Sequence, residues 1–139
     1  QVYREHGGTV IASTESSMET IHTKGVIGGS NVADGVVAVD QLVEKPARED
    51  APSNLTIVAR YIIDNAALDY LAEEHAGADG EIWLTDAIAY LIGKSPVHAL
   101  QIEGFHADTG NPEGMLRAAL YVAMQDPEMA AIVKQTLSD

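Results

Sequence analysis

Short runs of β-branched and other apolar residues recur through the first 63 positions, and they constrain the fold more than any other feature of the sequence. Residues 9–13, 25–28, 36–43 and 55–63 each have the length and composition of a strand. A Gly-, Asn- and Asp-rich loop separates the second and third runs and closes on Asp34-Gly35, a turn signal. A further strand is expected at residues 97–102. The sequence therefore predicts a sheet whose strands lie mainly in the first half of the chain.

Helix signals flank these strands. Residues 1–6 are expected to be the tail of a helix that Gly7-Gly8 stops. Asp64 is expected to cap a helix that residues 77–80 end, and Thr85 to cap the next one, which Gly93 ends. The apolar positions at helical spacing are Ala67, Leu68, Leu71, Ala72 and His75 in the former helix, and Ala87, Ile88, Leu91 and Ile92 in the latter.

Two further helices are expected near the C-terminus. Asn111-Pro112 and Asp126-Pro127 each place a capping residue before a proline at the first helical position. The first of these helices is expected to turn inward Met115, Leu116, Ala119, Leu120, Val122 and Ala123. Together these signals predict the α/β class, with a mixed β-sheet and flanking helices.

Composition limits the partners. A length of 139 residues suits one domain, and an apolar fraction of 46% fits a packed core. The net charge of −13 disfavours nucleic acid and anionic membranes, and no apolar run is long enough to span a bilayer. The N-terminal residues do not resemble a secretory signal, and the absence of cysteine fits a cytoplasmic protein.

Glu44 and Lys45 are the first candidate site residues. They follow the third expected strand, so they project into the space where α/β proteins bind ligands. Taken alone, such a pair is more often a solvated strand end. Three later segments change that balance: residues 53–61 (Ser-Asn-Leu-Thr-Ile-Val-Ala-Arg-Tyr), residues 80–87 (Gly-Glu-Ile-Trp-Leu-Thr-Asp-Ala) and residues 104–110 (Gly-Phe-His-Ala-Asp-Thr-Gly).

In that order and spacing, the segments, beginning with Val43-Glu44-Lys45-Pro46, resemble bacterial UTP–glucose-1-phosphate uridylyltransferases, of the sugar nucleotidyltransferase superfamily. The resemblance covers nearly the whole chain and matches the C-terminal half of that family's nucleotide-diphospho-sugar transferase fold. It implies that residues 1–139 form a single partial domain, the sugar-phosphate-binding half. The nucleotide-binding N-terminal half, with its glycine-rich segment, would be absent.

The resemblance also implies residue roles. Glu44 matches a carboxylate that accepts hydrogen bonds from the sugar hydroxyls, and Lys45 an ammonium that contacts the sugar's phosphate. Gly25 matches a glycine whose backbone approaches the sugar, where a side chain would block the approach. Ile57 and Tyr61 match strand positions that line the sugar pocket.

Asp108 matches an aspartate that, with a second one in the missing half, holds Mg²⁺ between the phosphates. The implied reaction joins UTP and glucose 1-phosphate into UDP-glucose and releases pyrophosphate. A phosphate monoester is already a dianion near neutral pH, so no general base is required. Lys45, Asp108 and Mg²⁺ would supply positioning and charge neutralisation.

Several residues depart from the family pattern. Lys24 stands where an aromatic residue is usual, Ala59 replaces a glycine, and Trp83, expected to pack, replaces a glutamine. The Asp108-Thr109-Gly110 form also resembles the thymidylyltransferase branch, so a thymidylyl- or cytidylyltransferase stays an alternative. Another is a non-catalytic module for sugar-phosphate binding or oligomerisation.

Two expectations follow from the missing half. The 139-residue chain alone should not synthesise UDP-glucose, because nothing in it resembles the segment that wraps the nucleotide phosphates. Removing central strands should expose sheet edges and apolar faces, so the chain is expected to form a homo-oligomer.

Overall fold

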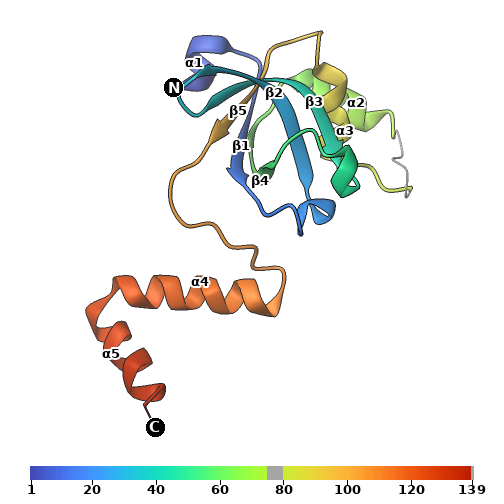
Figure 1. The fold of residues 1–139 in the computed structure, drawn as a ribbon. Coiled ribbons are helices and arrows are strands. Elements are labelled where there is room, and N and C mark those ends of the chain that lie inside the picture. The colour runs from blue at the N-terminus through green and yellow to red at the C-terminus, as the bar shows by residue number, and fades with distance from the viewer. Residues whose placement is uncertain (75–79, 139) are drawn as a thin grey trace. The chain divides into compact units, whose positions relative to one another are not determined.

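The computed structural model of the protein describes residues 1–74 and 80–138. The chain consists of two compact units, residues 1–102 and residues 103–139, and each is described by itself (Figure 1). Within the described ranges, the first unit contains the sheet and three α-helices, and the second contains two α-helices.

The first unit is built on a five-stranded sheet that closes on itself in the order β1-β4-β2-β3-β5. The strands are β1 (Thr9–Glu15), β2 (Gly25–Ala33), β3 (Val36–Glu44), β4 (Leu55–Ile62) and β5 (Val97–Gln101). The β1 strand runs parallel to β5, whereas the other neighbours are antiparallel. This arrangement confirms the mixed sheet of the α/β class.

The closed order corrects one expectation. Each described strand has a neighbour on both sides, because β5 pairs with both β1 and β3. No described strand therefore lacks a partner on one side, although β2 and β4 are joined at a single pair, Val26 with Thr56.

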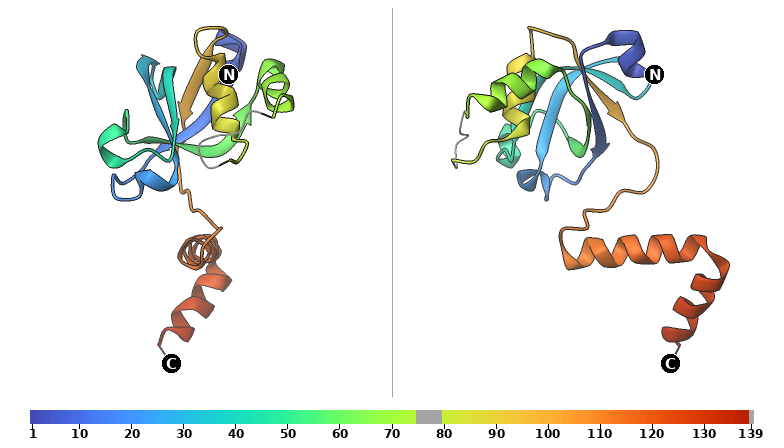
Figure 2. Two further views of the ribbon diagram at one scale, coloured as in Figure 1. Left: turned by 90° about the vertical axis from the view of Figure 1, so that its right-hand side faces the viewer. Right: turned by 180° about the vertical axis from the view of Figure 1, so that it is seen from behind.

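Helices α2 (Asn65–Ala72) and α3 (Leu84–Leu91) pack against each other beside the sheet, and α3 contacts β3 (Figure 2). Between the strands and these two helices lies the main core. Its buried members are Ile11, Ile27, Val39, Leu42, Ala67, Ala87, Ile88, Leu91, Val97 and Ala99. A short helix, α1 (Val2–His6), precedes β1 and ends at Gly7, as expected. Single 3₁₀ turns occupy residues Ile21–Thr23 and Arg48–Asp50.

The β2 strand is longer than predicted. It continues from Gly25 through Ala33, where a loop was expected, and only Asp34-Gly35 forms the turn. Register shifts between Gly28 and Gly29, and again before Ala33, let this polar segment keep pairing with β3. A side chain at Gly29 would overlap the Ala38 carbonyl, so glycine is required there.

The predicted helix starts are right at three positions and wrong at one. Asp64 accepts a hydrogen bond from the Ala66 N–H at 3.0 Å, and Asn111 and Asp126 cap their helices likewise. Thr85 is not a cap, because α3 begins at Leu84 after Trp83. The hydroxyl of Thr85 instead bonds to a distant carboxylate.

The inward face predicted for the first of the sheet-side helices is partly wrong. Ala67 is buried, but Leu68 and Ala72 are exposed on α2. The predicted inward His75, and most of the predicted stop at residues 77–80, lie outside the described residues. In α3, the buried Ala87, Ile88 and Leu91 confirm the predicted face.

The second unit comprises α4 (Pro112–Gln125) and α5 (Pro127–Thr136). The face predicted to turn inward is mostly exposed, including Leu116 at 60% and Val122 at 67%. Two helices within one small unit cannot enclose a core, so periodicity alone misplaced these side chains. Ala130 is the buried apolar side chain in the described part of this unit. Among the described residues, no helix combines the length and apolar character needed to cross a membrane.

Candidate functional site

The start of β2 brings three predicted site residues together. Gly25 lies opposite Glu44 in the β2–β3 register, and the pairing of Val26 with Thr56 sets Ile57 beside Gly25 from β4. A Cβ atom at Gly25 would lie 2.7 Å from the Ile57 Cδ1 atom and 3.0 Å from the Glu44 Oε2 atom. A side chain at Gly25 would therefore displace the ends of the Ile57 and Glu44 side chains, an effect separate from the predicted approach of a sugar.

The Glu44 carboxylate is held from α3. The Thr85 hydroxyl donates a hydrogen bond of 2.6 Å to Glu44 Oε2. Thr85 is buried and Glu44 is half-buried. Among the described residues this is the one hydrogen bond recorded to that carboxylate. Sequence reasoning treated Thr85 as a helix cap and missed this contact, because no local signal links positions 44 and 85.

Tyr61, from β4, is the fourth predicted site residue in this group. Its side chain is half-buried. Burial, and then the negative charge of Glu44, raises the pKa of the Tyr61 hydroxyl above its ordinary value. The phenol therefore stays protonated near neutral pH and can donate a hydrogen bond. We name Gly25, Glu44, Ile57, Tyr61 and Thr85 the Glu44 cluster.

Lys45 follows the cluster directly and is exposed. Its backbone has a φ of 46°, a left-handed value that is uncommon for a residue with a side chain. Its N–H donates to the Lys24 carbonyl at 2.9 Å, which holds this conformation. Left-handed residues other than glycine are often found at ligand sites.

The Lys45 ammonium lies 5.1 Å from the centre of the Trp83 ring. This distance suits a cation–π contact. The indole N–H of Trp83 donates to Glu81 Oε2 at 3.2 Å, so the ring is tethered as well as half-buried. Trp83 was expected only to pack. The structure also gives it a contact with a predicted phosphate-binding residue.

Asp108 lies in the second unit, just before α4. Its Oδ1 accepts from the Gly110 N–H at 2.9 Å and its Oδ2 from the Asn111 side-chain amide at 3.2 Å. The carboxylate is exposed. Because the two units are described separately, its predicted convergence with Glu44 and Lys45 stays a prediction.

The described residues contain no group of three or more His, Cys, Asp or Glu side chains that could hold a metal ion. Mg²⁺ does not require such a group, because it keeps several waters and often takes one or two carboxylates with substrate phosphates. A carboxylate has about four lone-pair sites, so Asp108 retains acceptor capacity beyond its two hydrogen bonds. Asp108 therefore fits as one ligand of such an ion.

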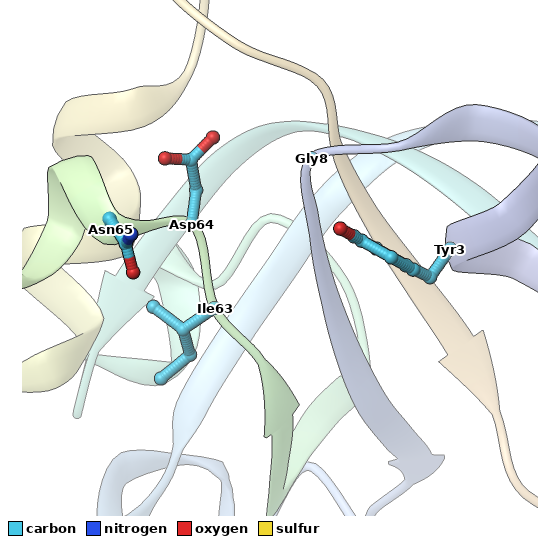
Figure 3. Close-up of a pocket in the computed structure, with 5 residues that line it drawn as sticks. All are labelled: Tyr3, Gly8, Ile63, Asp64 and Asn65. Carbon is cyan, nitrogen blue, oxygen red and sulfur yellow. The ribbon is translucent and has the colours of Figure 1, made fainter.

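A small cavity lies elsewhere in the first unit. It has a volume of about 250 Å³ and is lined by Tyr3, Gly8, Ile63, Asp64 and Asn65. Figure 3 shows Tyr3 extending from α1 toward Gly8, with Asp64 and Asn65 at the start of α2. No predicted site residue lines this cavity, and Asp64 already caps α2.

Comparison with known proteins defines the class. Residues 8–125 match the nucleotidyl transferase family, and the chain belongs to that family. Over 133 residues it is 39% identical to a UTP–glucose-1-phosphate uridylyltransferase of Staphylococcus epidermidis. The aligned region covers 96% of this chain and 46% of that protein. The chain thus spans about half the length of the curated relatives it matches.

Solved structures agree. A UDP-glucose pyrophosphorylase complexed with UDP-glucose superposes with a TM-score of 0.84 at 32% identity, over 90% of this chain and 47% of that one. A UTP-bound UGPase from Acinetobacter baumannii gives a TM-score of 0.81 at 27% identity, over 99% of this chain and 47% of that one. The family resemblance and the α/β fold predicted from the sequence are confirmed.

Proposed function

We propose that this chain is the sugar-phosphate-binding, C-terminal part of a UTP–glucose-1-phosphate uridylyltransferase. The complete protein would make UDP-glucose and pyrophosphate from UTP and glucose 1-phosphate. The Glu44 cluster, with Lys45 beside it, supports the proposal, because a carboxylate that can accept from hydroxyls stands next to an ammonium that can contact a phosphate. The names of the relatives support the same substrates.

Each residue has a role that its surroundings support. Glu44 would accept hydrogen bonds from the sugar hydroxyls with the oxygen that Thr85 does not occupy. Tyr61, kept protonated, would donate to the sugar, and Ile57 would cover an apolar face of the ring. Gly25, which has no side chain, would let the sugar approach the backbone at the start of β2.

Lys45 would neutralise the charge of the phosphate of glucose 1-phosphate while an oxygen of that phosphate attacks the α-phosphorus of UTP and pyrophosphate leaves. Such a phosphate is largely dianionic near neutral pH, so it needs no base to attack. Bound Mg²⁺ would supply additional neutralisation of phosphate charge, with Asp108 as one of its ligands. In a chain with a net charge of −13, these cations also reduce the repulsion of an incoming nucleotide.

The same proposal covers the partners and location. The base of UTP would be recognised by a part of the protein outside these 139 residues. The residues described here would therefore be inactive alone. A homo-oligomer and a cytoplasmic location belong to this proposal, the first because α4 and α5 present apolar side chains such as Leu116 and Val122.

The test is an assay of the complete protein with a panel of nucleotides and sugar 1-phosphates, with and without Mg²⁺. We expect the highest kcat/KM with UTP and glucose 1-phosphate, and Mg²⁺ dependence. Lys45→Ala should lower kcat/KM by about a hundredfold or more, because a charged group at the reacting phosphate is lost. Lys94→Ala, which removes a lysine stacked on Tyr90, is the matched control and should change little.

The alternatives give different results. Preference for dTTP or CTP would indicate a thymidylyl- or cytidylyltransferase. Binding of sugar phosphates without turnover by the complete protein would indicate a non-catalytic module. Equal activity of the Lys45 and Lys94 variants would contradict the role of Lys45, and turnover by the 139-residue chain alone would contradict its expected inactivity.

The metal role of Asp108 has its own test. Asp108→Asn should raise the Mg²⁺ concentration needed for half-maximal activity, because a neutral amide is a weaker ligand for a hard cation. Asp69→Asn, a change at an exposed carboxylate of α2, is the control. An unchanged Mg²⁺ requirement in Asp108→Asn would remove Asp108 from the metal site.

A further inference from the structure

Thr85 has an arrangement that helix capping does not explain. It lies in the first turn of α3, and the residue is 8% exposed. The hydroxyl donates to Glu44 Oε2 at 2.6 Å, across 41 positions of sequence. A hydroxyl-to-carboxylate bond of this length is charge-assisted and stronger than a neutral one.

The helix that presents this hydroxyl is fixed in the core. Ala87, Ile88 and Leu91 of α3 have exposed fractions of 0%, 0% and 1%. The Thr85 side chain therefore moves little relative to the sheet, because shifting it would disturb closely packed neighbours.

Glu44, in contrast, stands at the end of β3, just before the left-handed Lys45. A glutamate side chain there has several rotamers, and fixing it on ligand binding would cost entropy. Tying Oε2 to a rigid helix removes part of that cost in advance. It also leaves Oε1 as the oxygen available to a ligand.

We propose that Thr85 is a positioning residue that fixes the Glu44 carboxylate for recognition of the sugar hydroxyls. This inference rests on the proposed function. It predicts that loss of the Thr85 hydroxyl weakens binding of the sugar phosphate and leaves binding of the nucleotide unchanged. A merely structural role, with Thr85 joining α3 to β3, would alter stability without that selectivity.

The experiment uses the complete protein with Thr85→Val, which keeps the side-chain shape and removes the hydroxyl. We expect the KM for glucose 1-phosphate to rise about tenfold, from loss of one charge-assisted hydrogen bond, with the KM for UTP changed less than about twofold. Thr85→Ser keeps the hydroxyl and should restore most of the affinity.

Thr9→Val is the matched control. Thr9 is also a buried threonine, with 0% exposure, but its hydroxyl accepts from the Asp64 backbone N–H at 3.1 Å. This variant should lower stability to a similar degree and leave both KM values unchanged. A comparable rise in the KM for glucose 1-phosphate in Thr9→Val would assign the Thr85 effect to general destabilisation.

A double-mutant cycle with Glu44→Ala tests the pathway of the effect. If Thr85 acts through Glu44, Thr85→Val should add less than about twofold once Glu44 is gone. Where turnover is too slow, the affinity for UDP-glucose, measured by calorimetry, replaces the KM. Full additivity of the two variants would overturn the inference.

The outcomes separate the two proposals. An active wild-type protein whose Thr85→Val variant behaves like Thr9→Val overturns the role of Thr85 and leaves the function standing. A complete wild-type protein that neither turns over nor binds UDP-glucose overturns the proposed function, and the role of Thr85 with it.

Discussion

The two units of this chain are organised by different kinds of interaction. In the first unit, strands distant in sequence pair into a closed sheet, and ten buried residues among those that the structure describes share one core. In the second, α4 and α5 begin at local caps, and most of their apolar side chains are exposed. Local sequence can therefore specify helices without specifying what they pack against.

The two units also differ in what holds their candidate site residues in place. The Glu44 cluster joins residues from β2, β3, β4 and α3, so its geometry depends on the whole first unit. Asp108 is held by its own neighbours, Gly110 and Asn111. A change in the core should therefore disturb the cluster and spare the Asp108 loop.

The largest expected effect compares Ile88→Ala with Leu116→Ala, two changes that remove the same number of carbon atoms. Ile88 is 0% exposed, so its truncation should lower the free energy of unfolding by about 3 kcal/mol. Leu116 is 60% exposed and should cost less than about 0.5 kcal/mol. Urea denaturation of the 139-residue chain measures both, by circular dichroism and by the emission of Trp83, its single tryptophan.

An equal loss in the two variants would break the comparison. It would mean that the apolar face of α4 is buried in solution. A dependence of the Leu116→Ala effect on protein concentration would then assign that burial to self-association.

The next effect compares two aspartate caps. Asp64→Ala should lower the stability of the first unit by about 1 kcal/mol and leave α2 formed, because α2 packs on α3. Asp126→Ala removes hydrogen bonds to the Glu128 and Met129 N–H groups of α5. With few buried contacts to compensate, it should lower the helical circular dichroism without denaturant. Unchanged helicity in Asp126→Ala would show that α5 has tertiary support.

A smaller, stabilising effect is expected at Ala59, whose φ is 47°. The left-handed conformation costs a residue with a Cβ atom about 1–2 kcal/mol, partly offset by the greater flexibility of unfolded glycine. Ala59→Gly should therefore raise the free energy of unfolding by about 0.5 kcal/mol. The control, Ala38→Gly within β3, should lower it by about as much. A loss of stability in Ala59→Gly would contradict the strain.

The smallest effect concerns pH. Because the pKa of Tyr61 is raised on folding, the native state keeps this proton when the unfolded state has lost it. The resulting stability is complete below pH 10.0, the ordinary pKa, and is lost as the pH rises above it. Tyr61→Phe should lack this component of the alkaline loss in urea denaturation.

Glu44→Gln sharpens the same measurement. Removing the carboxylate charge should move the pKa of Tyr61 toward its ordinary value, while burial keeps it raised. Difference absorbance of tyrosinate between each protein and its Tyr61→Phe counterpart isolates this one phenol. An identical titration with and without the Glu44 charge would contradict the closeness of the two groups.

The sequence predicted the parts of this fold that local chemistry determines. The caps at Asp64, Asn111 and Asp126 follow from side-chain hydrogen bonds to N–H groups two or three residues away. The same rule failed at Thr85, because a distant carboxylate binds its hydroxyl instead. The capping rule considers only neighbouring residues, so it cannot predict a hydrogen bond that forms when α3 packs against β3.

The site follows the same division. Gly25, Glu44, Ile57 and Tyr61 were predicted through their resemblance to a family, and the structure places them together. The contact of Trp83 with Lys45 was not predicted. Trp83 departs from the family pattern, and Lys45 is too distant in the sequence for a local signal to link the two. The closed sheet was missed because pairing of β5 with two strands has no local signal.

The parallel pairing of β1 with β5 has a consequence for synthesis on the ribosome. Thr9 meets Val97 in this pairing, so the edge of β1 that pairs with β5 stays uncovered until residues 97–101 have been synthesised. Contacts this distant slow folding, and unpaired edges favour association in the interval. A nascent chain halted before Val97 would leave uncovered the edges of β1 and β3 that pair with β5, and those edges would be open to association.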